Sequence, residues 1–265
     1  MTVKMEDVKK VREITGAGMS SCKDALVKTE GNVDEAIKLL QKEGLAASNA
    51  RINKQTSEGR IFSHQNGNVV TMYAVKCETD FVANSEDFKN IEMYRNNGET
   101  LEAVLDKLKV SMRENIQLGD SIDVTYDEGD IVSTYIHSDG KSGAVTIIKG
   151  YDSAKIKEAI QFAFDTCLHM VAFTPMYIST EDVSVTTINE KREIFTAQMN
   201  NDPKMVNKPD KVKEGILEGK IKKALSELCL MDQPFVKDDK HSVAEVLKRE
   251  CGPDAKIVTA KLITL

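Results

Sequence analysis

The chain has 265 residues, of which 41% are hydrophobic and 29% charged, and its formal net charge is −6 at pH 7. This composition is typical of a folded globular protein, and the acidic balance argues against one that binds nucleic acid by neutralising phosphates. No apolar run reaches the roughly 20 residues that a membrane-spanning helix needs, and residues 1–6 lack the apolar centre of a signal peptide. We therefore expect a cytoplasmic protein that binds neither a membrane nor nucleic acid directly.

Residues 1–45 are predicted to form three short helices. Apolar residues recur at helical spacing from Val8 to Ile14, a glycine-containing break follows at 15–18, and two further helical patterns end at Gly44. Such a bundle resembles a ubiquitin-associated domain, which is usually a binding module. The small polar residues at 46–57 predict a linker after it.

A sheet-forming region begins after the linker. Asn66-Gly67 lies between two β-like runs and predicts a first hairpin, and a second is expected to turn at 138–140. The charged stretch from 86 to 115 between them is predicted to be helical. This arrangement favours an α+β region with antiparallel strand pairing.

The corner between the first hairpin and the helical stretch, residues 77–85, carries a carboxylate beside an aromatic ring. A strand-to-helix corner can project side chains from a rigid scaffold. Two interpretations of Asp80 and Phe81 follow from the residues themselves. Either they are exposed contact residues, or Phe81 tucks under the sheet while Asp80 caps the next helix.

A long helix is predicted from about Ser153 to Phe173. One apolar stripe is expected to face the core, and it consists of Ile156, Ile160, Ala163, Cys167 and Met170 or Val171. Phe162, His169 and Phe173 would then lie near the opposite side. That second face predicts either an interaction surface or a half-buried histidine with satisfied hydrogen bonds.

Two helices with narrow apolar stripes follow, separated by a break at 200–203, and they predict an antiparallel helical hairpin that protrudes from the body. Residues 233–236 mark the return to the core, which ends in a short helix and a strand. The predicted fold is therefore α+β, with antiparallel sheets and helices in two core subdomains. Its predicted parts are 1–45 (helical bundle), 46–57 (linker), 58–140 (first core subdomain), 141–184 with 232–265 (second core subdomain) and 185–231 (hairpin).

The cysteines and histidines predict no metal site and no cofactor. The five cysteines never form a Cys-x-x-Cys pair, and the four histidines are widely separated. A cysteine and a histidine that only the fold brings together would leave open a thiol hydrolase.

Four segments resemble the bacterial elongation factor Ts family. They are Thr15-Gly16-Ala17-Gly18-Met19 with Cys22-Lys23-Asp24-Ala25-Leu26, Thr79-Asp80-Phe81-Val82-Ala83, His169-Met170-Val171-Ala172, and Gln233-Pro234-Phe235-Val236. The first two are long and specific, and all four follow the order of the family along essentially the whole chain. Residues 93–120 show no clear match.

The resemblance implies a guanine-nucleotide exchange factor for the GTPase elongation factor Tu, which would be a binding protein and not an enzyme. It also implies that Asp80 and Phe81, with Thr79 and Val82 beside them, enter the partner near its magnesium site. His169 would press on the partner from another side. Further implied contacts are Arg12, Met19 and Val236.

Two departures from the family pattern change what we expect. Ser20 stands where many members have a second methionine, which predicts a weaker apolar contact. Some relatives carry a C-terminal helix after the last strand that touches the partner, and we expect no such contact from this sequence. Some relatives also dimerise, which makes a homodimer through residues 185–231 a further hypothesis.

The main alternative function is an adaptor that binds a protein partner through its N-terminal helices alone. That hypothesis gives Asp80 and Phe81 no role. A thiol hydrolase is the third hypothesis.

Overall fold

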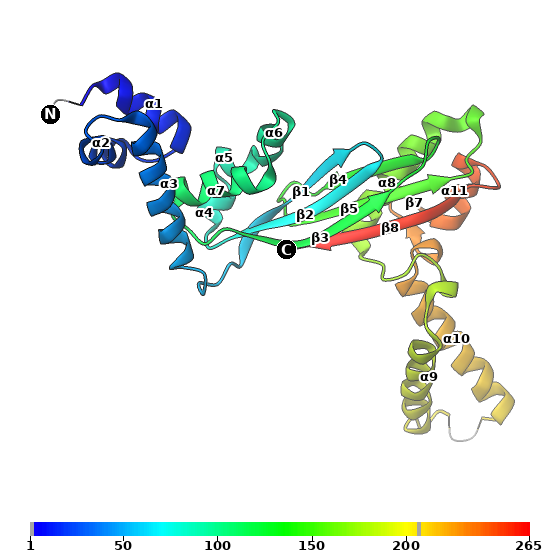
Figure 1. Cartoon of the computed structure of the whole chain (residues 1–265). Helices are drawn as coiled ribbons and strands as arrows, with labels where there is room; N and C mark the ends of the chain where they lie inside the picture. The colour runs from blue at the N-terminus through cyan, green and yellow to red at the C-terminus, as the bar shows by residue number, and fades with distance from the viewer. Residues whose placement is uncertain (1–2, 206–207) are drawn as a thin grey trace. The chain divides into compact units, whose positions relative to one another are not determined.

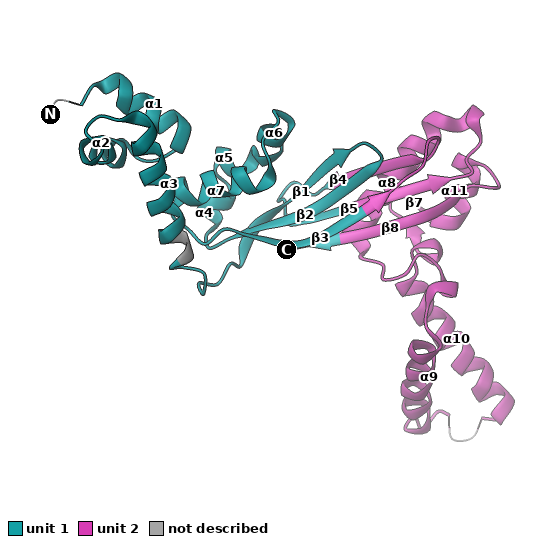
Figure 2. Cartoon of the chain, viewed as in Figure 1, with its two compact units in different colours: residues 1–123, 136–143, 263–265 teal, residues 124–135, 144–262 magenta. Residues whose placement is uncertain are grey.

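A computed structural model describes residues 3–205 and 208–265 as a mixture of helices and antiparallel strands (Figure 1), which confirms the predicted α+β class. The chain divides into two compact units (Figure 2). The first contains the described residues up to Asp123 together with 136–143 and 263–265, and the second contains 124–135 and 144–262. Among the described residues, none of the helices combines the length and the hydropathy that a membrane crossing requires.

The first unit begins with α1 (Met5–Thr15), α2 (Met19–Lys28) and α3 (Val33–Asn49). Gly16 ends α1 with a φ of 65°, a left-handed conformation that glycine adopts without steric cost, and its N–H donates to the carbonyl of Arg12. The helices enclose a small core of Val8, Val11, Ala17, Cys22, Ala25, Leu26, Ala36 and Leu40. The apolar faces that the spacing of the sequence predicts thus pack together into one shared core.

The third helix corrects a prediction. The sequence predicts that the helical region ends at Gly44, but α3 continues to Asn49, inside the stretch predicted as linker. A Cβ atom at Gly44 would lie 2.7 Å from the Cα atom of Val110 in α7 (Leu101–Met112). Gly44 therefore permits a close approach between two helices, and it does not end one.

The sheet of the first unit has the order β1-β2-β3. The strands β1 (Glu58–Asn66) and β2 (Val69–Cys77) form the predicted hairpin, and Gly67 in its turn has a φ of 58°. The edge strand β3 (Gln117–Thr125) was not predicted, because only Val124 in it is fully buried and its apolar alternation is weak.

Short helices cover this sheet. They are α4 (Asp80–Ala83), α5 (Glu86–Lys89) and α6 (Ile91–Asn96), followed by α7. The shared core contains Phe62, whose ring stacks on Tyr73 at 5.7 Å and contacts Phe88 at 6.1 Å. The predicted helical stretch from 86 to 115 is therefore several short helices around this aromatic cluster.

The second three-stranded sheet has the order β4-β5-β8, and most of its residues lie in the second unit. Its strands are β4 (Ile131–Ile136), β5 (Ser142–Lys149) and β8 (Lys256–Thr264). The helices α8 (Ile156–Phe173) and α11 (Val243–Cys251) share an apolar core with it. A short pair, β6 (Pro234–Phe235) and β7 (Asp238–Ser242), leads into α11.

The buried face of α8 includes Ala163, Cys167 and Met170, as predicted, but the first two members of the predicted stripe do not face the core. Ile156 and Ile160 are 45% and 53% exposed, whereas Phe162 and His169 are buried. Phe162 stacks on Phe235 at 5.1 Å, so the segment that returns from far along the chain covers this face. The spacing of apolar residues does not indicate which face of α8 is buried, because both faces are rich in apolar residues.

The remaining helices of the second unit, α9 (Val185–Asn200) and α10 (Asp210–Leu228), lie side by side (Figure 1). Ile188, near the start of α9, belongs to the same apolar cluster as Leu225, near the end of α10, so the helices run in opposite directions. Arg192 and Glu218 form an ion pair between them.

Candidate partner-binding site

Asp80 and Phe81 are the first two residues of α4, which begins after a two-residue connection from β2. Thr79 is the N-cap of this helix, because its backbone is extended and its hydroxyl accepts a hydrogen bond from the N–H of Val82 at 3.4 Å. Asp80 is therefore not the cap. Its carboxylate is exposed and makes no hydrogen bond or ion pair with another described residue.

Phe81 is 84% exposed, more than any other large hydrophobic side chain in the described part of the chain. Val82 and Ala83, the next residues, are buried in the core of the first unit. The interpretation in which Phe81 tucks under the sheet is therefore wrong. An exposed phenyl ring beside a carboxylate, on a helix whose other side is anchored, is a surface suited to a protein partner.

Positive charges lie near this corner. Glu58, whose carboxylate is 2.9 Å from Lys141, raises the pKa of that lysine, and Asp80 adds a smaller contribution of the same sign. Arg60 donates to the side chain of Asn84 at 3.5 Å. The corner thus carries an apolar tip with mixed charge around it.

No motif in the sequence indicates which residues hold the corner in place. Glu114 accepts hydrogen bonds from the N–H groups of Glu78 and Thr79, both at 3.1 Å, and from the Thr79 hydroxyl at 2.6 Å. Arg51 forms a two-pronged ion pair with Glu78. These partners are 27 to 36 residues apart in the chain, so no local motif could reveal them.

His169, the second implied contact, is fully buried. Its Nδ1 accepts a hydrogen bond from the N–H of Val236 at 3.2 Å, so its Nε2 carries the proton and donates to Oε1 of Gln233 at 2.7 Å. Burial lowers the pKa of His169, and the ring is neutral near pH 7. The structure therefore joins His169 to Val236, two residues that the resemblance implied as separate contacts.

Arg12 and Met19 flank the turn between α1 and α2. Arg12 is exposed on the last turn of α1, whereas Met19, the first residue of α2, is half-buried against the three-helix core. An exposed guanidinium beside a partly accessible thioether can make one ionic and one apolar contact with a partner.

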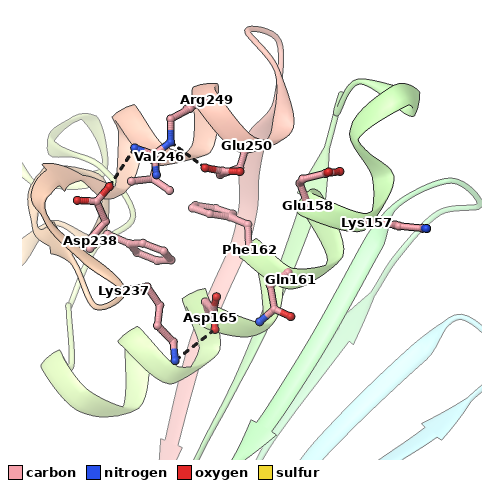
Figure 3. Close-up of a pocket in the computed structure, with 11 residues that line it drawn as sticks. Lys157, Glu158, Gln161, Phe162, Asp165, Lys237, Asp238, Val246, Arg249 and Glu250 are labelled. Atoms are coloured by element: carbon pink, nitrogen blue, oxygen red, sulfur yellow. Dashed lines mark hydrogen bonds and ion pairs between the residues drawn. The ribbon is translucent and has the colours of Figure 1, made fainter.

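A cavity of about 460 Å³ lies in the second unit between α8 and α11 (Figure 3). Five of the charged residues that line it pair with one another: Arg249 is 2.9 Å from Asp238 and 2.7 Å from Glu250, and Lys237 is 4.0 Å from Asp165. Because these opposite charges balance locally, the cavity presents no cluster of one sign to a charged ligand.

The thiol chemistry that the sequence left open is disfavoured. All five cysteines are buried, and desolvation raises the pKa of Cys77 to about 12 and that of Cys167 to about 11. A thiol with such a pKa is protonated at neutral pH and is a weak nucleophile. Among the described residues, no group of His, Cys, Asp and Glu is arranged to hold a metal ion.

The capped corner with its exposed Phe81 has the features of a contact surface for another macromolecule. A family model described as Elongation factor TS matches residues 89–264 of this chain. The chain belongs to the elongation factor Ts family, which confirms the resemblance seen in the sequence.

Curated relatives named Elongation factor Ts match nearly the whole chain. The protein of Treponema denticola is 41% identical over 268 residues, covering 96% of this chain and 94% of the relative. That of Borreliella burgdorferi is 36% identical over 256 residues, covering 92% and 90%. That of Borrelia recurrentis is 34% identical over 275 residues, covering 99% and 96%.

Proposed function

We propose that the corner at Asp80 and Phe81 opens the nucleotide site of elongation factor Tu. Membership of the elongation factor Ts family makes the chain a guanine-nucleotide exchange factor for that GTPase in translation elongation. The observation that carries the assignment to this corner is the 84% exposure of Phe81 on a helix anchored by Val82.

The chemistry of the nucleotide site suits such a corner. GDP and its magnesium ion are held by charge and by backbone amides around the phosphates. The Asp80 carboxylate would disturb the water shell of the magnesium, and the Phe81 ring would supply the apolar contact that stabilises the distorted partner. Thr79 caps the helix, and Val82 anchors it to the core.

The other site residues extend this contact. We assign Arg12 and Met19 to a second contact through residues 1–45, a ubiquitin-associated-like module. Val236 is half-buried and would touch the partner, while the buried His169 acts on the partner through it. His169 thus becomes a positioning residue in this proposal, since its ring has no exposed surface.

The domain organisation proposed here follows the sequence boundaries except at the first one, because α3 continues to Asn49: its parts are 1–49, 50–57, 58–140, 141–184 with 232–265, and 185–231. The last part, α9 with α10, is proposed as a hairpin through which two copies pair. Exposed apolar side chains on these helices support that role, since they would be covered in a dimer; they are Val185, Ile194 and Val212. An adaptor acting through the N-terminal helices alone would leave the exposed Phe81 unexplained.

Nucleotide and exchange factor should weaken each other's binding to elongation factor Tu. If this protein weakens GDP binding, GDP must weaken the binding of this protein by the same factor, since the two are thermodynamically linked. We expect the affinity for the nucleotide-free GTPase to exceed that for the GDP-bound form by at least about tenfold. Titration calorimetry with and without excess GDP measures both, and equal affinities would contradict exchange.

The roles of charge and ring can be separated with magnesium. Asp80→Asn keeps the side-chain shape but removes the charge, so we expect GDP release to slow by about fivefold, which corresponds to about 1 kcal/mol. This defect should shrink when EDTA removes magnesium, whereas a Phe81→Ala defect should persist. Release rates at saturating factor, with magnesium and with EDTA, give the comparison. The same response of both variants to EDTA would refute the separation.

A further inference from the structure

We propose that Glu114 and the Arg51–Glu78 ion pair are positioning residues, which hold the corner in the orientation from which Phe81 acts. The inference rests on the proposed role of Phe81 in exchange. It concerns residues that lie outside the implied contact set and that only the fold brings to the corner.

Glu114 lies directly after α7, where Arg113 adopts a left-handed conformation with a φ of 56°. This reversal of the chain turns the Glu114 carboxylate toward the end of β2. There it accepts two backbone N–H groups and the Thr79 hydroxyl, at 3.1, 3.1 and 2.6 Å. Hydrogen bonds to a charged acceptor are stronger than neutral ones, so Glu114 restrains both the residue before the cap and the cap itself.

The Arg51–Glu78 pair adds a second restraint from the other side. Arg51 donates through Nε to Oε1 of Glu78 at 2.6 Å and through Nη2 to Oε2, a two-pronged geometry that restricts rotation of both groups. Oε1 of Glu78 also accepts the N–H of Asn115 at 2.7 Å. The Arg51 guanidinium lowers the pKa of Glu78 to about 2, so the pair is ionised at neutral pH.

Asn115 connects the two restraints to the segment after α3. Its buried side chain donates to the carbonyls of Ile52 and Lys54, at 3.1 and 2.9 Å. The stretch that the sequence predicts as a linker is therefore bound to the residues that hold the corner. Residues 51–54, 78–79 and 114–115 form one hydrogen-bonded network.

The corner needs this network because α4 has only four residues. A helix of one turn has no stability of its own, and the exposed Phe81 contributes no packing that would orient it. The burial of Val82 and Ala83 anchors one side of α4, and the direction of the ring then depends on how Thr79 and the end of β2 are held. A ring fixed in its bound orientation loses less conformational entropy on binding.

The test measures the rate of GDP release from elongation factor Tu at saturating full-length factor. Glu114→Gln and Arg51→Ala are each introduced into the wild-type protein and into the Phe81→Ala variant. Weakening charge-assisted hydrogen bonds should lower the maximal rate by about tenfold for Glu114→Gln and about threefold for Arg51→Ala. In the Phe81→Ala background each change should slow release by a smaller factor, because only the Asp80 carboxylate then remains to be positioned.

Two control variants make comparable chemical changes at sites outside the network. Glu245 accepts the N–H and hydroxyl of Ser242, at 2.7 and 3.2 Å, so Glu245→Gln repeats the Glu114 change at the start of α11. Lys107 pairs with Glu99 at 2.6 Å, so Lys107→Ala removes a comparable exposed ion pair. Both controls should keep the wild-type maximal rate.

Several results would overturn the proposal. One is a wild-type maximal release rate for Glu114→Gln. Another is that Glu114→Gln lowers this rate by the same factor in the Phe81→Ala background as in the wild type. The third is that Glu245→Gln lowers the rate as much as Glu114→Gln does. Should Glu114→Gln prove unfolded by thermal melting, Arg51→Ala decides, since that side chain is on the surface. Full activity of Phe81→Ala would instead disprove the proposed site, which distinguishes that failure from failure of the network.

Discussion

We expect the replacement of Phe81 by alanine to lower the rate of GDP release at saturating factor by about 30-fold or more, because truncating a central aromatic contact costs on the order of 2 kcal/mol. Stability should be nearly unchanged, since the ring is 84% exposed and makes almost no intramolecular packing. Release of a fluorescent GDP gives the rate, and thermal unfolding of the free protein gives the stability.

Met176 provides a matched control for Phe81. It is also a large hydrophobic side chain, 70% exposed, and lies outside the proposed contact set. Met176→Ala should retain full exchange. A Phe81→Ala protein with full activity would remove the apolar role of the corner, and a large loss of its stability would show that the ring packs internally.

Replacing His169 by alanine should lower the free energy of unfolding by about 2–4 kcal/mol, from the cavity left in the core and the hydrogen bonds lost with the ring. The ring lies 4.7 Å from Phe173 and 6.0 Å from Phe235, and it pairs with Gln233 and with the N–H of Val236. Exchange should slow as well, since the segment that carries Val236 loses its support. Urea unfolding and GDP release measure the two effects.

The pH dependence of stability offers a separate test of the buried histidine. Burial lowers the pKa of His169 in the folded protein below its ordinary value of 6.5, so below that pH the unfolded chain binds the proton more readily than the folded one. The contribution of His169 is therefore fully present above about pH 6.5 and is lost as the pH falls toward the folded-state pKa.

Wild-type stability should consequently fall more steeply between pH 7 and pH 5 than that of His169→Ala. Phe164→Ala is the control, because it removes another ring of α8, which packs against Tyr135, and leaves the imidazole and its neighbours in place. Its pH dependence should follow the wild type. Equal slopes for wild type and His169→Ala would mean that the histidine is accessible to protons in the folded state.

Local patterns in the sequence were enough to predict the helices and the hairpin whose formation depends on neighbouring residues. Asn66-Gly67 predicts the β1–β2 hairpin because its turn needs a positive φ that glycine supplies. Helical spacing of apolar residues predicts α1 and α8. The specific motif around Asp80 and Phe81 identified the family and pointed to the corner.

Tertiary structure alone decided which side chains of these elements face outward. Phe81 is exposed because Val82 and Ala83 are the residues that reach the core, and His169 is buried because the strand at Phe235 covers its face of α8. Gly44 lies within α3, where its missing Cβ atom allows α7 to approach closely. Each of these outcomes depends on a contact between segments far apart in the chain, and such a contact leaves no periodic pattern in the local sequence.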